Sequence, residues 1–316
     1  MEKITPVALF AYNRPNHIRR ALESLAACRR LRECRLLVFC DGPKRTDDVE
    51  SVGLTREVVR NWAKAHGAEV IERETNLGLA NSIVTGVSDL CREHGRVIVI
   101  EDDLVVSPDF IDYMLQGLDR YEDQPEVYQV SGCVPAEKPN TTYAYFLPLT
   151  TTWGWATWER AWKIFQWEPE NAQDELAQSE MRHRFDLDGV CSYTTMLEER
   201  LAGRNDSWGI LWWWAVFQAN GLVLYPPRSL VYNNGFDDTG VHCGSNSVFR
   251  QASLDAFSQP RLTGELVFPV SLEPDYAAFD LVKAALGNTT AVSDTVPQGR
   301  WSARVRRLFG RRHPDM

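Results

Sequence analysis

The chain has 316 residues and a formal net charge of −9, with 43 acidic and 34 basic side chains. A chain of this length can bury a large core, in one broad α/β domain or in two closely joined halves. The negative charge argues against general binding to nucleic acid, because a phosphate backbone requires a basic protein face. The seven cysteines are scattered without the paired spacing of a zinc site, so we expect reduced thiols rather than disulfides.

The two ends of the chain bear on its location. The opening segment 1–7 is too short and too polar for a signal peptide, and no apolar stretch approaches the length that crosses a bilayer. We therefore expect a cytoplasmic protein. From Arg300 onward the chain is rich in arginine, and four apolar side chains fall on one side of a helix: Trp301, Val305, Leu308 and Phe309. This segment predicts either peripheral binding to an anionic membrane surface or a disordered, solubilising tail.

Apolar strands alternate with helical patterns along the first hundred residues. The predicted strands are 7–12, 36–40, 69–71 and 96–100, and the predicted helices are 16–28, 55–66 and 79–93. Repeated βα units imply a parallel, doubly wound sheet. A helix over 108–121 and a strand over 127–130 continue this pattern.

The most informative junction lies near residue 100, where an apolar strand ends in Glu101, Asp102 and Asp103. Such a run is typical of a strand buried on both faces of a sheet, and Ser107-Pro108 predicts a helix start with a serine N-cap and proline at the first position. The acids are then expected at the carboxyl end of a central strand, where open α/β sheets bind ligands. Carboxylate oxygens there suit a hard divalent cation that keeps open positions for phosphates. A solvated acidic turn is the alternative interpretation.

Tryptophan dominates the chain after Ser131: nine of the eleven tryptophans lie between residues 153 and 214. We predict most of them to be core residues, with 158 and 162, and 208 and 212, as helical i,i+4 pairs. Trp153-Gly154-Trp155 is different, because a glycine between two rings suits a backbone that approaches a ligand while the rings form a wall. Ligand contact and core packing both remain open for this segment.

Seven segments carry a family resemblance in their order along the chain: Val7 to Pro15, Val38 to Gly42, Asn76 to Asn81, Glu101 to Asp103, Trp153 to Ala156, Asn205 to Trp208, and Asn234 to His242. Together they resemble the GT-A glycosyltransferases, especially family 2 enzymes and the N-acetylglucosaminyltransferase that begins complex N-glycan branching. The resemblance implies an α/β fold of the GT-A type, with a mostly parallel sheet flanked by helices and a C-terminal helical extension. We expect a nucleotide-sugar-binding half over 1–131, an acceptor and catalytic half over 132–262, and an extension over 263–316.

The resemblance also implies a set of donor contacts. The first loop, with Tyr12 and Arg14, is similar to the one that receives the nucleotide. Asp41, which ends the second strand, would read the base or ribose, and Asn76 and Gly78 would border the nucleotide. The same role is implied for Asp102, while Trp153, Gly154 and Trp155 are similar to the stretch around the donor sugar. On composition alone, Asp41 and the Asn76 segment would be ordinary turns.

The metal and catalytic residues follow from the same resemblance. Glu101-Asp102-Asp103 matches the Asp-x-Asp type of motif, whose last aspartate is the direct manganese ligand, so Asp103 is the expected ligand with Glu101 beside it. His242, in a late glycine-containing loop, would ligate the metal or contact a phosphate. Asp237 and Asp238 in that loop are expected to be solvated acids.

Asn205-Asp206-Ser207-Trp208 resembles the acidic segment that carries the general base of this family. Serine replaces its second acid here, so the base is Asp206 or an acid elsewhere. Asp206 could instead cap the helix that follows it, because aspartate is favoured at that position.

The resemblance implies a metal-dependent, inverting glycosyltransferase that uses Mn²⁺ or Mg²⁺ and a nucleotide sugar, with UDP as the expected nucleotide. The acceptor would be a glycan or a lipid-linked hydroxyl in surface polysaccharide synthesis, at the inner face of the membrane. A bound divalent ion would neutralise charge on the leaving phosphates, and a carboxylate would activate the weakly nucleophilic hydroxyl. Two alternatives remain: a sugar-1-phosphate nucleotidyltransferase, which would need a glycine-rich first loop, and a non-catalytic nucleotide-sugar or glycan-binding protein.

Overall fold

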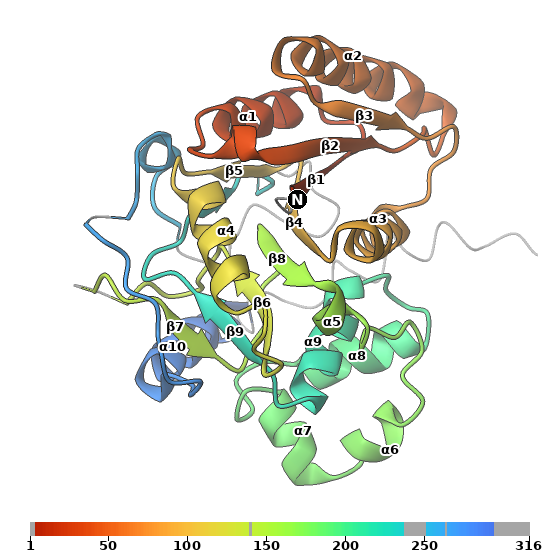
Figure 1. Cartoon of the computed structure of the whole chain (residues 1–316). Helices are drawn as coiled ribbons and strands as arrows, with labels where there is room; N and C mark the ends of the chain where they lie inside the picture. The colour runs from red at the N-terminus through yellow and green to blue at the C-terminus, as the bar shows by residue number, and fades with distance from the viewer. Residues whose placement is uncertain (1–3, 139–140, 237–250, 263, 294–316) are drawn as a thin grey trace, which may run out of the picture.

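The computed structural model describes residues 4–138, 141–236, 251–262 and 264–293. In this part of the chain an eight-stranded sheet has the order β3-β2-β1-β4-β8-β6-β9-β7 (Figure 1). Its strands are β1 (Thr5–Ala11), β2 (Cys34–Cys40), β3 (Glu69–Glu72), β4 (Arg96–Glu101), β6 (Val127–Ser131), β7 (Tyr145–Leu147), β8 (Trp155–Trp158) and β9 (Leu222–Tyr225). Strands β7 and β8 run antiparallel to their neighbours, and the other strands share one direction.

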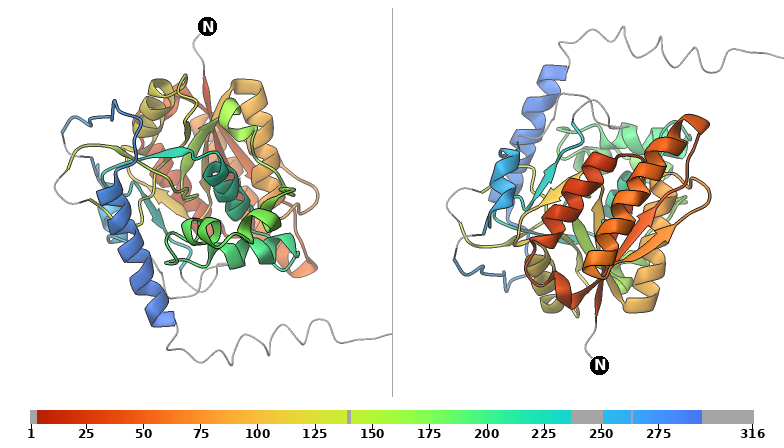
Figure 2. Two further views of the ribbon diagram at one scale, coloured as in Figure 1. Left: turned by 90° about the horizontal axis from the view of Figure 1, so that it is seen from below. Right: turned by 90° about the horizontal axis from the view of Figure 1, so that it is seen from above.

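Helices flank this sheet on both faces. They are α1 (Pro15–Ala26), α2 (Val49–His66), α3 (Leu79–His94), α4 (Phe110–Arg120), α5 (Glu159–Trp162), α6 (Ala172–Leu176), α7 (Ser179–Phe185), α8 (Tyr193–Leu201), α9 (Trp208–Gln218) and α10 (Tyr276–Ser293), with short 3-10 turns at Leu31–Glu33, Thr46–Asp48 and Leu254–Ser258. Figure 2 shows strands between α3 and α4. The α/β fold with a mostly parallel, helix-flanked sheet and a C-terminal helix is confirmed.

Side-chain contacts explain how the two faces are covered. Gly86 of α3 lies so close to Phe10 of β1 that a Cβ atom on the glycine would come within 2.7 Å of the ring. On the opposite face, Gly117 of α4 packs in the same way on Val130 of β6. Each glycine therefore lets a helix axis approach the sheet closely, and the central strands are buried from both sides.

Parallel pairing brings the ends of three strands to one edge. Strand β1 pairs with β2 and β4, with Ala11 opposite Cys40 and Phe10 opposite Glu101. All seven residues of β1 are buried, as are the first five of β4. The residues that follow these strands, Tyr12, Asp41 and Asp102, consequently leave the sheet at the same edge.

Two predicted helix starts are wrong. Helix α2 begins at Val49 rather than residue 55, because its first turn carries exposed residues that hide the apolar period. Helix α4 begins at Phe110 rather than residue 108, with Asp109 at the N-cap position. Leu104–Val106, just before it, form strand β5, which pairs antiparallel with β10 (Val231–Asn233). Ser107 is therefore not an N-cap, and its backbone N–H donates to the carbonyl of Leu230 at 2.9 Å. Long-range pairing overrides the local capping signal here.

The tryptophans form a buried cluster beneath the second half of the sheet. The Trp155 ring is fully buried and stacks on Trp208, with ring centroids 5.4 Å apart. Trp162 and Trp212 contact the same ring. The prediction that most tryptophans are core is confirmed, but Trp158 ends strand β8, so it and Trp162 are not a helical pair.

The C-terminal part of the described chain covers one edge of the sheet. Helix α10 lies beside β7 and buries Ala278, Val282 and Leu286 (Figure 2). None of the helices in the described residues is long and apolar enough to span a membrane.

Candidate functional site

The acidic cluster, Glu101 to Asp103, occupies the turn between β4 and β5 and is held by backbone N–H groups from two other segments. Glu101 is the last residue of β4, and Asp102 and Asp103 follow it before β5 begins at Leu104. The N–H of Tyr12 donates to Asp102 Oδ2 at 3.3 Å. The N–H of Asn234 donates to the Asp103 carbonyl at 2.8 Å. The first loop and the segment after β10 thus meet at the acids.

Arg14 supplies positive charge to this cluster. Its Nη2 lies 3.3 Å from Asp103 Oδ2 and 3.5 Å from Asp102 Oδ1. Burial acts to lower the pKa of Arg14, but the charges of Asp102, Asp103 and Glu101 outweigh it and the pKa is raised. The guanidinium is therefore firmly charged next to the acids.

The carboxylates of the cluster are poorly solvated. Burial is the main cause that raises the pKa of Glu101 well above its usual range, and the charges of Asp103 and Asp102 add to the effect. Burial also raises the pKa of Asp102 to about 6, although Arg14 opposes this shift. The raised pKa values mean that negative charge is costly at this edge, and a bound cation would offset that cost.

The segment after β10 approaches the cluster through a glycine. A Cβ atom added to Gly235 would stand 2.6 Å from Asp103 Oδ2, so no larger residue fits without displacing that carboxylate. The Gly235 N–H is held by Asn233 Oδ1 at 2.7 Å, and the next ring, Phe236, contacts Trp153 edge-on with centroids 5.6 Å apart. Sequence reasoning noted the loop but missed this contact, which no local pattern reveals.

The carboxylate oxygens of the acidic cluster are suitable ligands for a hard divalent cation. Within the described residues no three His, Cys, Asp or Glu side chains converge as a complete metal cage. Magnesium-type sites, however, commonly use one or two carboxylates together with water and substrate phosphates. Asp103 and Asp102 already face a cationic group, since the Arg14 guanidinium lies at their oxygens. His242, Asp237 and Asp238 lie outside the described residues.

Asp41 is engaged by the backbone of the Asn76 segment. It is buried, and its carboxylate accepts hydrogen bonds from the N–H groups of Leu77 at 3.0 Å and Gly78 at 3.1 Å. The N–H of Gly42 donates to the same carboxylate at 3.1 Å. These contacts give Asp41 a structural role, namely to hold the end of β2 against the start of α3.

Asn76 and Gly78 complete this connection. The Asn76 amide donates to the Gly42 carbonyl at 2.9 Å. Gly78 has a φ of 77°, which glycine adopts at little cost, and it is the N-cap residue of α3. Both residues therefore lie at the edge of the sheet where they were expected, as parts of a tightly bonded turn.

Tyr12 extends the same edge toward the loop after β2. Its hydroxyl donates to Asp48 Oδ2 at 2.8 Å and accepts from the N–H of Lys44 at 3.0 Å. Burial and the hydrogen bond to Asp48 raise the pKa of Tyr12. Asp48 was not anticipated, because its partner is distant in sequence.

The residues of the Trp153-Gly154-Trp155 segment differ in their surroundings. Trp155 lies in the buried tryptophan cluster, which supports core packing, one of the two interpretations that the sequence leaves open for this segment. Gly154 has a φ of 62°, and a Cβ there would come within 2.8 Å of Val231, so packing accounts for this glycine. Trp153 is partly buried and faces Phe236, beside Gly235 and the acids.

Asp206 lies at the start of α9 and is exposed. The N-cap is Ser207, whose hydroxyl accepts from the N–H of Ile210 at 3.4 Å, so the interpretation of Asp206 as the cap is wrong. Gly209 in the first turn packs near Thr152, with 3.6 Å between its Cβ position and Thr152 Cγ2. The start of α9 thus lies against the loop that carries Trp153.

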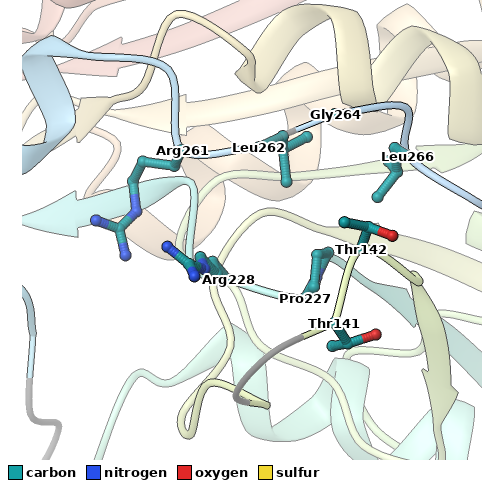
Figure 3. Close-up of a pocket in the computed structure, with 8 residues that line it drawn as sticks. All are labelled: Thr141, Thr142, Pro227, Arg228, Arg261, Leu262, Gly264 and Leu266. Atoms are coloured by element: carbon teal, nitrogen blue, oxygen red, sulfur yellow. The ribbon is translucent and has the colours of Figure 1, made fainter.

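Figure 3 shows a small hollow elsewhere, of about 10 Å³. It is lined by Thr141, Thr142, Pro227, Arg228, Arg261, Leu262, Gly264 and Leu266. None of these residues was predicted as a site residue, and the volume admits about one water molecule. We assign it no ligand.

Comparison with known proteins identifies one matching family model, Glycosyl transferase family 2, over residues 7–194. This range includes β1 to β4, the acidic cluster and the Trp153 segment. No curated protein matches the chain.

One solved structure similar to the chain is a mannosyltransferase from Pyrobaculum calidifontis in complex with GDP-mannose and Mn²⁺. The two sequences are 18% identical, the TM-score is 0.35, and the match covers 48% of this chain and 44% of that chain. Another is glucosyl-3-phosphoglycerate synthase from Mycobacterium tuberculosis in complex with Mn²⁺, UDP and glucosyl-3-phosphoglycerate. Here the identity is 17%, the TM-score is 0.33, and the match covers 53% of this chain and 60% of that chain. The match thus spans roughly half of each of these proteins.

Proposed function

Because this chain belongs to glycosyl transferase family 2, we propose that it is a metal-dependent, inverting glycosyltransferase that transfers a sugar from a nucleotide donor to an acceptor hydroxyl. The observation that carries the proposal is the Glu101–Asp103 cluster at the carboxyl edge of the central strand β4. Arg14 comes to this cluster from the loop after β1, and Gly235 comes to it from the segment after β10.

Asp103 would hold Mn²⁺ or Mg²⁺ through its hard carboxylate oxygens. Asp102, which the resemblance assigns to the donor, would take the place expected for Glu101, because Asp102 and Asp103 both have an oxygen within 3.5 Å of the Arg14 cation. When bound, the ion supplies Lewis-acid stabilisation of charge on the diphosphate leaving group. Tyr12 and Arg14 orient the loop that faces the donor. Asp41 fixes the turn of Asn76 and Gly78 that borders it.

Asp206 would accept the proton of the acceptor hydroxyl. It is exposed, and the start of α9 packs against the loop that carries Trp153, whose ring contacts Phe236 next to Gly235. A carboxylate within hydrogen-bond reach of the hydroxyl increases its nucleophilicity in the transition state. A single displacement of this kind inverts the anomeric centre.

The finer assignments rest on the sequence. We propose a UDP-sugar as donor, with a hexosyl or N-acetylhexosaminyl group, on the resemblance to the N-acetylglucosaminyltransferase. A glycan or lipid-linked acceptor in surface polysaccharide synthesis belongs to the same proposal. Attachment to the inner face of a membrane would depend on the segment from Arg300 onward, which lies outside the described residues.

The alternatives have less support. The first loop, Tyr12-Asn13-Arg14-Pro15, lacks the glycines that a nucleotidyltransferase needs around a triphosphate. A non-catalytic binding protein was suggested by the serine at position 207, but Ser207 has a structural explanation as the N-cap of α9. Turnover of a nucleotide sugar distinguishes an enzyme from a binding protein.

The test is the replacement Asp103→Ala. If Asp103 holds the metal, UDP with Mn²⁺ should raise the melting temperature of the unmodified protein but not that of the variant. Ligand at about a hundred times its dissociation constant stabilises by roughly 2.7 kcal/mol, which is readily measured. Asp89→Ala is the control, because Asp89 is exposed on α3 and its carboxylate pairs with Arg92. Equal stabilisation of the Asp103 variant by UDP and Mn²⁺ would refute the site.

A further inference from the structure

Arg14 lies where a cation would bind the acidic cluster. Its Nη2 is 3.3 Å from Asp103 and 3.5 Å from Asp102, and its side chain is only 21% exposed. Pro15 follows it and begins α1, which keeps the Arg14 backbone out of the helical region, at φ −119° and ψ 79°. The restrained backbone therefore fixes where the Arg14 side chain leaves the chain, next to the acidic cluster.

The contact between Arg14 and the acids is an incomplete ion pair. One nitrogen, Nη2, reaches both carboxylates, whereas Nη1 is buried and has no hydrogen-bond partner among the described residues. A bidentate arginine–carboxylate pair would use two parallel hydrogen bonds. A buried donor without a partner has lost its hydrogen bonds to water and gained none in return. The guanidinium is thus held mainly by charge and retains a donor for another anion.

We propose that Arg14 is the counterion of Asp102 and Asp103 in the metal-free protein, and that it competes with the divalent cation for Asp103. The proposal rests on the proposed function. A guanidinium and a divalent ion at one carboxylate repel each other, so metal binding requires Arg14 to move away from Asp103 Oδ2. A diphosphate then offers the guanidinium a new anionic partner.

The consequence is a coupling between metal and nucleotide. Without nucleotide, the cation must displace Arg14 with no compensating contact, so its affinity is reduced. With UDP present, the displaced guanidinium pairs with phosphate oxygens. Because such coupling is reciprocal, UDP should raise the affinity for Mn²⁺ by the same factor by which Mn²⁺ raises that for UDP. Arg14 contributes part of this factor, in addition to direct contact between metal and phosphate.

The test compares Mn²⁺ binding, measured by electron paramagnetic resonance, with and without UDP. We expect Arg14→Gln to bind Mn²⁺ alone about tenfold more tightly than the unmodified protein, within the usual 5–150-fold range of coupling between linked sites. Added UDP should then increase that affinity less than it does in the unmodified protein. The matched control is Arg19→Gln in α1, the helix that follows Arg14, because Arg19 is exposed and its guanidinium donates a hydrogen bond to Asn16 Oδ1. This control should behave as the unmodified protein does.

Unchanged or weaker Mn²⁺ affinity in a folded Arg14→Gln variant overturns the inference while leaving the proposed function intact. Absence of Mn²⁺ binding by the unmodified protein even with UDP would contradict the proposed function, and the inference with it.

A second measurement needs no folded glutamine variant. The ¹⁵N signal of the Arg14 side chain in the unmodified protein, assigned with Arg14→Lys, should shift when Mg²⁺ alone is added. A signal that does not move at saturating Mg²⁺ would also overturn the inference.

Discussion

Asp206 precedes Ser207, which caps α9, and its own side chain is exposed. Loss of a helix cap costs about 1 kcal/mol. That cost would fall on Ser207, so a change at Asp206 leaves the N-cap of α9 in place. The melting temperature of an Asp206 variant then reports any other structural effect separately from the rate of transfer.

If Asp206 is the general base, Asp206→Asn should lower the rate of sugar transfer by roughly a hundred to ten thousand-fold. The affinity for the donor should change little, since a base acts on the acceptor hydroxyl. The rate of transfer, the affinity for UDP and the melting temperature of the variant check this expectation. Transfer at the unmodified rate would remove Asp206 from the mechanism and direct the search to Asp237 and Asp238.

Strands β5 and β10 connect the acidic cluster to the segment that follows β10. Asn233 pairs with Leu104 in this two-stranded sheet, and the N–H of Asn234 bonds to the carbonyl of Asp103. The pairing sets Gly235 directly over the Asp103 carboxylate. The orientation of the expected metal ligand thus depends on an element more than a hundred residues later in the chain.

Gly235→Ala should displace the Asp103 carboxylate, because its Cβ would meet Oδ2 at 2.6 Å. We expect weaker Mn²⁺ binding in the presence of UDP, by about tenfold or more for a misplaced ligand group, as measured by calorimetry. Gly53→Ala is the control: Gly53 lies within α2 with open space around its Cβ position. Alanine there should stabilise the protein by roughly 0.5–1 kcal/mol. Equal Mn²⁺ binding by both variants would show that the close approach of Gly235 has no functional consequence.

At the scale of the molecule, the described residues combine an eight-stranded mixed sheet and a two-stranded sheet with helix α10 along the β7 edge (Figure 1). The acidic cluster and the tryptophan cluster belong to this body, whereas the arginine-rich segment follows α10 and lies outside the described residues. The proposal of membrane attachment therefore rests on sequence: apolar residues on one side of a possible helix and arginines around them.

Deletion of residues 298–316 should release the protein from vesicles that contain an anionic lipid and leave transfer in solution unchanged. Sedimentation with the vesicles measures this, and vesicles of neutral lipid are the control. Added salt should weaken the attachment, because attraction between exposed charges is screened over about 8–10 Å at ordinary ionic strength. No binding of the full chain at low salt would indicate that the segment is merely solvated.

Much of the first half could be predicted from local patterns. The strands that end at Ala11, Cys40 and Glu101 are apolar runs bounded by polar residues, and helices α1 and α3 show a clear 3.6-residue period. Because parallel strands share one carboxyl edge, these patterns were sufficient to bring Tyr12, Asp41 and the acids together.

Contacts between distant segments could not be predicted in this way. Asp41 is occupied by the N–H groups of Leu77 and Gly78, and Trp155 is fully buried against Trp208. Strand β5 lies just before the predicted helix start, pairs with the distant β10, and is followed by a helix that begins at Phe110 rather than residue 108. Local sequence encodes the period and polarity of an element, whereas the partners of a side chain depend on how elements pack. The place of the acids at the end of β4 could therefore be predicted from the sequence. The positions of Arg14 and Gly235 over these acids could not, because they depend on how distant segments pack in the folded chain.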